Sequence, residues 1–312
     1  MNNQVDLWKT PQADEMFMIA GWRQWADAGA ISSGLPQYLI DYTGAEKIGQ
    51  IIPDGFYLFQ IPGTHHLLRP EISFEQGYRT NLQRHKNELF YMGNPRKGLI
   101  IFLGDEPHLA IDQYVNAFFD AAEALQIKRI AALGGVYGAM PYDKDREISC
   151  VYSLPNLKGE LAEYAVRFSD YEGGATIGAY MLDEAERRGL EFFVFYGFVP
   201  AYDLSQQETI PLQGMRIEND YKAWYDLMNR LNHMFGLEID LTDLSNNSDE
   251  LIISMEDKIE ELEQKLPQLK VREYLEKITG DFTERPFSPL GDVWKRELGD
   301  LFEGFDDDPT LS

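Results

Sequence analysis

The sequence is poor in cysteine and in positive charge. Its 312 residues include one cysteine, Cys150, and 28 lysines and arginines against 52 aspartates and glutamates, which gives a formal charge of −24. One cysteine allows no internal disulfide and no thiolate zinc cluster, so the composition favours a reducing compartment and predicts a cytoplasmic protein. The acidic excess repels phosphate backbones, and no basic patch stands out, so we expect no nucleic acid partner.

Long apolar runs are also missing. The N-terminus lacks the basic start and apolar stretch of a signal peptide, and the apolar run at 192–202 is too short to cross a bilayer. We therefore expect neither export nor a membrane partner. Hydrophobic residues make up 44% of the chain and aromatic residues 13%, an ordinary globular composition for a chain long enough to bury a substantial core.

Familiar catalytic and cofactor signatures are absent as well. The sequence holds no HExxH, no G-x-S-x-G and no phosphate loop, and the glycine-rich run at 172–178 does not match the dinucleotide fingerprint. Gly174 in that run is a weak candidate for binding an anion, although a tight turn is favoured. His65 and His66 are adjacent and share no face, so we expect no metal and no cofactor. Cys150 lies in an apolar segment typical of an inert buried thiol.

Strands and helices alternate over residues 14–235. The run GLIIFL at 98–103 is typical of a strand buried on both faces, and a helix around 115–125 and a strand at 129–133 complete a right-handed βαβ unit with parallel strands. Further strands are expected at 17–20, 47–52, 56–60, 148–154 and 191–196, extended segments around a polar connection at 71–91, and helices at 30–42, 157–166, 176–188 and 218–235. The pattern predicts an α/β domain built as a three-layer α/β/α sandwich.

The chain changes character near residue 236. Residues 236–312 hold 21 acidic and 8 basic residues, so this quarter of the chain carries more than half of the net charge. Helices are expected at 249–265 and 271–278, with apolar residues every three or four positions from 252 to 269. Two interpretations stay open: an amphipathic hairpin packed on the main domain, or a coiled-coil-like arm for self-association or a partner. We predict a helical acidic subdomain at 236–280 and an acidic tail at 281–312 that could be flexible.

The turns after the strands hold the candidate site residues, because ligand sites of parallel sheets gather beyond the carboxyl ends of the strands. Asp105, Glu106 and His108 follow GLIIFL and could supply a general base or oxygen ligands for a divalent cation. Adjacent residues leaving a strand usually point different ways, which favours a structural role for the two carboxylates. The other candidates for ligand contact lie on neighbouring turns: Asp27, Gly29, Gly135, Tyr137 and Tyr142.

Taken together, these turns resemble the PAC2 family, that of proteasome assembly chaperone 2 and its archaeal and bacterial relatives. The matching segments are GW and DAG within 21–29, RP at 69–70, LGDEP at 103–107, LGG at 133–135, EGGATIGAYML at 172–182 and VPAY at 199–202. They follow one another in order over most of the chain. The resemblance implies a sandwich similar to that of nucleoside phosphorylases and related hydrolases, a helical C-terminal part and homo-oligomers, without a defined reaction.

Two departures from the family pattern limit which functions of the relatives we expect in this chain. Tyr142 follows Pro141 where many relatives have a histidine, and Asp145-Arg146-Glu147 replaces a second Arg-Pro. The chain ends Thr310-Leu311-Ser312, without the hydrophobic residue and tyrosine of the proteasome-binding relatives. We therefore expect no role for that histidine and no docking of this C-terminus into a proteasome pocket.

Two functions remain consistent with the sequence. The favoured one is a non-enzymatic assembly or protein-interaction protein, which forms homo-oligomers and meets a partner through the helical region 250–280. The alternative is a small-molecule hydrolase or phosphorylase acting on a nucleoside-like or acyl substrate. That reaction would use the strand-end residues Asp105, Glu106, His108, Tyr137 and Tyr142.

Overall fold

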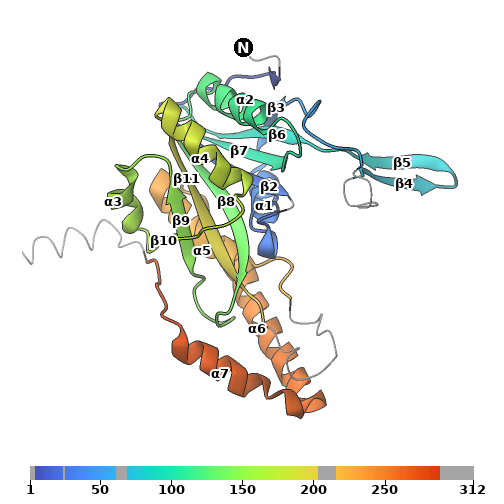
Figure 1. Ribbon diagram of the computed structural model, residues 1–312, viewed down its shortest axis with the longest axis vertical. Coiled ribbons are helices and arrows are strands. Elements are labelled where there is room, and N and C mark those ends of the chain that lie inside the picture. Colours follow the sequence, from blue (N-terminus) through green and yellow to red (C-terminus); the bar gives the residue numbers. More distant parts are fainter. Residues whose placement is uncertain (1–3, 24, 61–68, 203–215, 289–312) are drawn as a thin grey trace, which may run out of the picture.

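A computed structural model describes residues 4–23, 25–60, 69–202 and 216–288 of the chain (Figure 1). These residues form a nine-stranded sheet in the order β1-β3-β6-β7-β2-β8-β11-β9-β10. Its strands are β1 (Val5–Leu7), β2 (Glu15–Arg23), β3 (Glu46–Ile51), β6 (Asn87–Gly93), β7 (Lys97–Asp105), β8 (Arg129–Gly138), β9 (Ile148–Tyr152), β10 (Arg167–Phe168) and β11 (Glu191–Pro200).

The centre of the sheet is parallel and its margins are mixed. Strands β7, β2, β8 and β11 run parallel, whereas β6, β3 and β1 on one side and β9 on the other are antiparallel to their inner neighbours. The predicted βαβ unit is present as β7, α2 (Ile111–Ala124) and β8. Its two strands are parallel, but they are not neighbours, because β2 lies between them and pairs with both.

Helices cover both faces of the sheet, which confirms the predicted α/β class. Helices α2 and α4 (Ile177–Arg188) pack on one face, and α1 (Gly34–Thr43) and α5 (Tyr221–Phe235) pack on the other (Figure 1). Successive strand residues enter different cores: Met18 packs among side chains of α2 and α4, whereas Phe17 and Ile19 pack with those of α1 and α5. Burial on both faces explains why the central strands are continuous apolar runs.

Some predicted elements differ in kind or extent. The strand predicted at 56–60 is wrong: this segment is an irregular loop, and the Phe56 carbonyl accepts hydrogen bonds from the backbone of His108 and Leu109 instead of a neighbouring strand. Helix α3 (Leu157–Ala162) ends earlier than predicted, because Ala165 adopts a φ of 52°, which no α-helix accommodates. The extended segments expected at 71–91 include β4 (Glu71–Glu75) and β5 (Tyr78–Gln83), which pair as a hairpin standing out from the body (Figure 1).

Two helices follow the sheet domain. Helix α6 (Thr242–Lys265) starts before the predicted 249, and a 3-10 turn at Pro267–Leu269 leads into α7 (Val271–Asp281). Met255, Ile259 and Leu275 of these helices are buried in the same core cluster as Leu227 of α5. The apolar stripe of the pair is thus covered by the chain's own domain. The boundaries predicted at 236 and 281 stay predictions, and residues 289–312 lie outside the described residues. Within the described ranges, no helix is long and apolar enough to cross a membrane.

Candidate functional site

The turns singled out in the sequence meet along one edge of the sheet. Strands β2 and β7 end level with each other, since Arg23 pairs with Asp105. The turn after β2 then crosses toward β8, where Asp27 forms a bridge with Gly135. Candidate residues from three turns therefore lie close together at this edge, and their individual contacts decide what they do.

Glu106 stabilises the start of α4. Its Oε1 accepts a hydrogen bond from the backbone N–H of Ile177 at 3.0 Å, while the Thr176 hydroxyl accepts one from the N–H of Ala179 at 3.1 Å. Burial raises the pKa of the Glu106 carboxyl, and the backbone hydrogen bonds oppose this rise. A carboxylate at the positive end of a helix is favourable. Glu106 therefore caps the start of α4.

The cavity beside Glu106 is small. Its volume is about 20 Å³, and its lining includes Trp22, Ser32, Glu106, Thr176 and Tyr196. One buried water needs about 10–15 Å³ of such space. The hydroxyl oxygens of Thr176 and Tyr196 lie 2.6 Å apart and bond each other. The described part of this cavity therefore suits a single water.

Asp105 meets a different set of partners from Glu106, as the alternation of strand residues predicts. Its carboxylate accepts a hydrogen bond from the backbone N–H of Lys86 at 2.8 Å. The same carboxylate lies 3.3 Å from His85 Nδ1 and 3.6 Å from Arg23 Nη1. These contacts tie the segment before β6 to the end of β7. The two adjacent carboxylates do not share one centre.

His108 belongs to an aromatic corner next to Asp105. Its Nδ1 accepts a hydrogen bond from the N–H of Leu58 at 3.2 Å, and its ring packs edge-on against Tyr57 and His85, with 5.6 Å between centroids in each case. Burial, and then the neighbouring His85, lower the pKa of His108. Within the described ranges, His85 Nε2 and Asn87 Nδ2 are buried without a hydrogen-bond partner. The corner fixes the 56–58 loop to the sheet.

Metal binding finds no support at this edge. Among the residues that the structure describes, no three His, Cys, Asp or Glu side chains are grouped so as to hold an ion. His65 and His66 lie outside the described residues. Cys150 is buried in β9, and burial raises the pKa of its thiol. Its environment matches the inert thiol that the sequence predicts.

Asp27 and Gly135 hold the turn after β2 against β8. Asp27 Oδ1 accepts hydrogen bonds from the backbone N–H groups of Ser32 and Ser33, both at 2.9 Å. Gly135 permits the close approach of this turn, because a Cβ there would lie 2.0 Å from the carbonyl oxygen of Ala28. Both residues shape the backbone of this turn.

Gly29 joins the same turn to α5. Its φ of 61° is favourable only for glycine, and its carbonyl oxygen accepts hydrogen bonds from the N–H of Asp220 and from Trp224 Nε1, both at 2.9 Å. The Gly29 carbonyl therefore joins the sheet edge to the helix that covers one face.

The remaining candidates lie apart from one another. The Tyr137 hydroxyl accepts a hydrogen bond from Arg216 Nε at 2.6 Å. The Tyr142 hydroxyl instead donates to Glu256, which links the β8–β9 connection to α6. Gly174 is exposed, and a Cβ added to it would meet nothing within 4 Å. Among the residues that the structure describes, Tyr137, Tyr142 and Gly174 therefore have surroundings separate from those of Asp27, Gly29 and Gly135.

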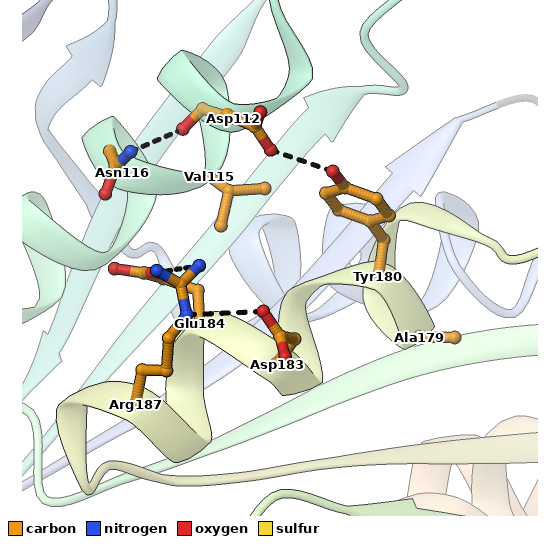
Figure 2. A pocket seen from close by; sticks show the side chains of 8 residues that line it. All are labelled: Asp112, Val115, Asn116, Ala179, Tyr180, Asp183, Glu184 and Arg187. Carbon is orange, nitrogen blue, oxygen red and sulfur yellow. Dashed lines mark hydrogen bonds and ion pairs between the residues drawn. The ribbon is translucent and has the colours of Figure 1, made fainter.

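A shallow groove lies away from this edge, between α2 and α4 (Figure 2). Its volume is about 300 Å³, and Val115 forms part of its floor. The Tyr180 hydroxyl donates to Asp112 at 2.8 Å on one side, and Arg187 Nε lies 3.2 Å from Asp183 on the other. None of the residues proposed from the sequence lines this groove. Its carboxylates give it an acidic rim.

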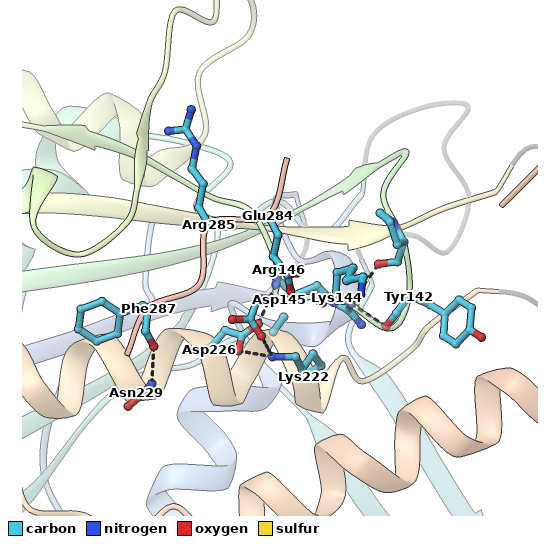
Figure 3. Close-up of polar contacts among 12 residues, drawn as sticks. Tyr142, Lys144, Asp145, Arg146, Lys222, Asp226, Asn229, Glu284, Arg285 and Phe287 are labelled. Atoms are coloured by element: carbon cyan, nitrogen blue, oxygen red, sulfur yellow. Dashed lines mark hydrogen bonds and ion pairs between the residues drawn. The ribbon is translucent and has the colours of Figure 1, made fainter. Parts of the chain in front are cut away.

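The sequence reasoning missed a buried network of charges (Figure 3). The guanidinium of Arg146 binds both carboxylate oxygens of Asp220, and its backbone N–H donates to Asp226 at 2.7 Å. Lys222 completes the network through ion pairs with Asp226 and Asp145. A signal was present: charges at 222, 226 and 230 recur every four residues on an otherwise apolar helix. This spacing places them on one face of α5.

Arg230 extends the network to the segment that follows α7. It donates to the carbonyl oxygens of Tyr164 at 2.8 Å and Asp226 at 2.7 Å, and its guanidinium lies 5.2 Å from the ring centre of Phe287. Asn229 Nδ2 donates to the Phe287 carbonyl at 3.2 Å. The start of the predicted acidic tail is therefore packed on α5, as Figure 3 shows for Phe287 and Asn229.

Comparison with known proteins gives a family. The sequence model of the PAC2 family matches residues 22–262, about three quarters of the chain. The chain belongs to the PAC2 family. The family resemblance inferred from the sequence is thereby confirmed. None of the curated protein sequences compared with this PAC2 chain matches it.

Solved structures share the PAC2 fold at low sequence identity. A proteasome-assembly chaperone homologue from Mycobacterium tuberculosis has a TM-score of 0.66 and 18% identity, over 78% of this chain and 94% of its own. A PAC2 family protein from Streptomyces avermitilis has a TM-score of 0.66 and 21% identity, over 83% and 99%. PbaB, a proteasome activator from Pyrococcus furiosus, has a TM-score of 0.56 and 19% identity, over 82% and 98%. These values establish a shared fold.

The α6–α7 pair gives this PAC2 chain an acidic outer surface. Glu250, Asp257, Glu260 and Glu261 on α6 are all exposed, opposite the buried Met255 side of the helix. Arg272 of α7 joins the two helices, since it lies 2.6 Å from Glu256 and 2.7 Å from Glu263 of α6, whereas Lys265 pairs with Glu261 within α6. The surface remains predominantly negative.

Proposed function

We propose that this PAC2 chain is a non-enzymatic, chaperone-like protein that binds a protein partner. The proposal rests on one observation above others: Asp105, Glu106 and His108 accept hydrogen bonds from backbone N–H groups, and the neighbouring cavity has room for one water. Side chains engaged in this way hold turns and a helix end in place. The family relation to proteasome assembly chaperone homologues points in the same direction.

The acidic outer face of α6 is the proposed binding surface. Its apolar stripe is used within the chain, so a partner meets carboxylates rather than a hydrophobic seam. Opposite charge across an interface speeds encounter and selects the partner. We therefore infer a partner with a basic surface, and the names of the structural relatives make proteasome subunits the first candidates.

The proposed test uses purified proteasome α- and β-subunits as probes for the full chain. The α6 variant carries Asp257→Lys, Glu260→Lys and Glu261→Lys, three exposed positions outside the core. The matched control carries Glu163→Lys, Asp170→Lys and Glu172→Lys. These three positions are also exposed and are distant in sequence from α6. The parent and the control should co-elute with the subunits and alter their assembly, whereas the α6 variant should not.

Two results would contradict the proposal. One is a parent chain that neither binds the subunits nor changes their assembly. The other is an α6 variant that binds as well as the parent does, because the binding surface would then lie elsewhere. Circular dichroism and the melting temperature of each variant separate lost binding from lost folding.

Two finer inferences accompany this proposal. The likeness of the sheet to nucleoside phosphorylases follows from the family resemblance and describes architecture, not a reaction. A cytoplasmic location follows from the single cysteine, Cys150.

A further inference from the structure

The segment that follows α7 is attached to the sheet domain through one aromatic side chain. This segment, residues 282–288, is called the strap below; it runs from the end of α7 back toward the sheet domain (Figure 1). Its two phenylalanines are half-buried and its other residues are exposed. The ring of Phe287 lies 5.5 Å from that of Tyr164 and 6.0 Å from that of His233, and 5.2 Å from the Arg230 guanidinium. These three side chains form the slot for the ring.

Hydrogen bonds accompany the ring in its slot (Figure 3). Asn229 Nδ2 donates to the Phe287 carbonyl at 3.2 Å, and Glu284 Oε1 accepts from the backbone N–H of Asp145 at 2.9 Å. Hydrogen bonds near the surface add little net stability, because water replaces them when they break. The Phe287 ring is therefore the main attachment of the strap. A segment with so little buried apolar surface opens locally more easily than a core strand does.

Helix α7, to which the strap is joined, covers part of α6. Val271 and Leu275 of α7 are buried in the core cluster, and most of its other residues are exposed. Arg272 of the same helix lies on two carboxylates of α6, those of Glu256 and Glu263. Both carboxylates are half-buried, whereas the acidic residues of the proposed binding surface are exposed. Separation of α7 from α6 would therefore add two carboxylates to that surface.

We propose that the strap is a latch that regulates the acidic surface of α6. With Phe287 in its slot, α7 stays on α6 and Arg272 pairs with Glu256 and Glu263. When the strap leaves the slot, α7 separates from α6 and the two carboxylates become free to meet a basic partner. The partner binds the open form more tightly and so shifts the chain toward it. This regulation rests on the proposed function of α6, and the latch itself is tested without a partner.

The first measurement is amide hydrogen exchange of the full chain, followed by mass spectrometry. Phe287→Ala removes a half-buried ring, which corresponds to roughly a tenfold shift of the latch equilibrium. Exchange across residues 271–281 should therefore accelerate about tenfold, while the central strands keep the rates of the parent. Asn229→Ala weakens the latch from the side of α5 and should accelerate the same segment to a smaller extent. Phe74→Ala, which deletes a ring that is 61% exposed on β4, is the matched control and should leave this segment unchanged.

The second measurement labels the carboxyl groups of the full chain with a carbodiimide and an amine. Phe287→Ala should speed the labelling of Glu256 and Glu263, and Asp257, exposed on the same helix, is the internal reference. Arg272→Gln should speed the labelling of the same two carboxylates while the strap stays in place. Adding Phe287→Ala to Arg272→Gln should give little further gain, because the two changes act on the same contact.

The third measurement is binding of the purified proteasome subunits to the same proteins. Phe287→Ala and Arg272→Gln should both bind more tightly than the parent does. Arg187→Gln makes the same change of charge at an arginine of α4 whose side chain is 67% exposed, so it should bind as the parent does.

The outcomes separate the latch from the binding surface. Unchanged exchange across 271–281 in Phe287→Ala overturns the latch. Faster exchange with unchanged labelling of Glu256 and Glu263 overturns the uncovering of the carboxylates, and equal binding by parent and Phe287→Ala overturns the regulation. If no protein of the series binds the subunits, the proposed function fails, and exchange and labelling still decide whether the latch exists.

Discussion

Arg146 and Asp220 form a two-pronged ion pair in the interior of the molecule. Arg146 Nε lies 2.9 Å from Asp220 Oδ2, Nη2 lies 3.2 Å from Oδ1, and both side chains are fully buried. Asp220 also accepts a hydrogen bond from the N–H of Ala223 and so caps α5. The pair connects the β8–β9 connection to the helix on one face of the sheet.

Replacing Arg146 with methionine should lower the free energy of unfolding by about 3–5 kcal/mol, because Asp220 would stay buried without its partner. Urea denaturation measures this loss. Arg167→Met is the matched control, since Arg167 pairs with Glu147 at 2.7 Å at the surface, where such a pair contributes about 0–1 kcal/mol. Similar losses in the two variants would show that the buried pair has no special role.

Gly29 and Gly174 should respond oppositely to alanine. Gly29→Ala places a Cβ 2.7 Å from that of Asp220 at a φ of 61°, so we expect a loss of about 2–4 kcal/mol. Gly174→Ala meets nothing within 4 Å and should be neutral or stabilising by up to about 1 kcal/mol. Thermal and urea unfolding check both. A ligand role for Gly174 would instead appear as a lost anion effect on the melting temperature.

The sequence predicts the central sheet well because burial leaves a clear pattern there. The apolar runs at 98–103, 129–133 and 191–196 become β7, β8 and β11, since parallel strands covered on both faces tolerate few polar residues. The order of these strands in the sheet cannot be predicted in the same way. Strand β2 lies between β7 and β8 and pairs with both, although it is distant from them in sequence, and hydrophobic periodicity does not indicate which strands pair.

The candidate site is predicted less well, because the type of a residue does not show which groups its side chain will bind in the folded chain. Asp105, Glu106 and Asp27 have the right chemistry for a site and the right place at the sheet edge. Their oxygens nevertheless accept backbone hydrogen bonds, which depend on how loops fold back. Burying an unpaired charge is costly in free energy, so a sequence alone predicts residues such as Arg146 and Asp220 at the surface. The structure shows that the two are buried as an ion pair.

Cys150 should be unreactive in the folded protein. Its side chain is buried in β9, and burial raises the pKa of its thiol, so the thiolate that reacts with disulfide reagents is scarce. With one cysteine in the chain, labelling by a chromogenic disulfide reports this site alone. Labelling should be slow in buffer and complete within the mixing time in denaturant. Rapid labelling of the native protein would contradict the burial of β9.

Glu106 should make stability depend on pH in a defined direction. Burial raises the pKa of its carboxyl above the usual 4.5, so the folded chain binds this proton more tightly than the unfolded chain does. Between those two pKa values the folded state holds more protons, and stability falls as pH rises. Glu106→Gln removes the charge, while its amide oxygen still accepts the hydrogen bond from Ile177.

The Glu106→Gln variant should therefore gain stability relative to the parent as pH rises above the usual carboxyl pKa of 4.5, because ionising the parent carboxyl is less favourable in the folded chain than in the unfolded one. Burial also raises the carboxyl pKa values of Asp27 and Asp226, but these two residues are the same in the parent and the variant. The difference between the free energies of unfolding of the two proteins at each pH therefore reports Glu106. Thr176→Ala, which removes the neighbouring cap, should cost about 1 kcal/mol on both sides of that pKa, since it has no proton to exchange. If the stability of Glu106→Gln relative to the parent falls instead as pH rises, the folded chain favours the charged carboxylate, as a cation-binding site does.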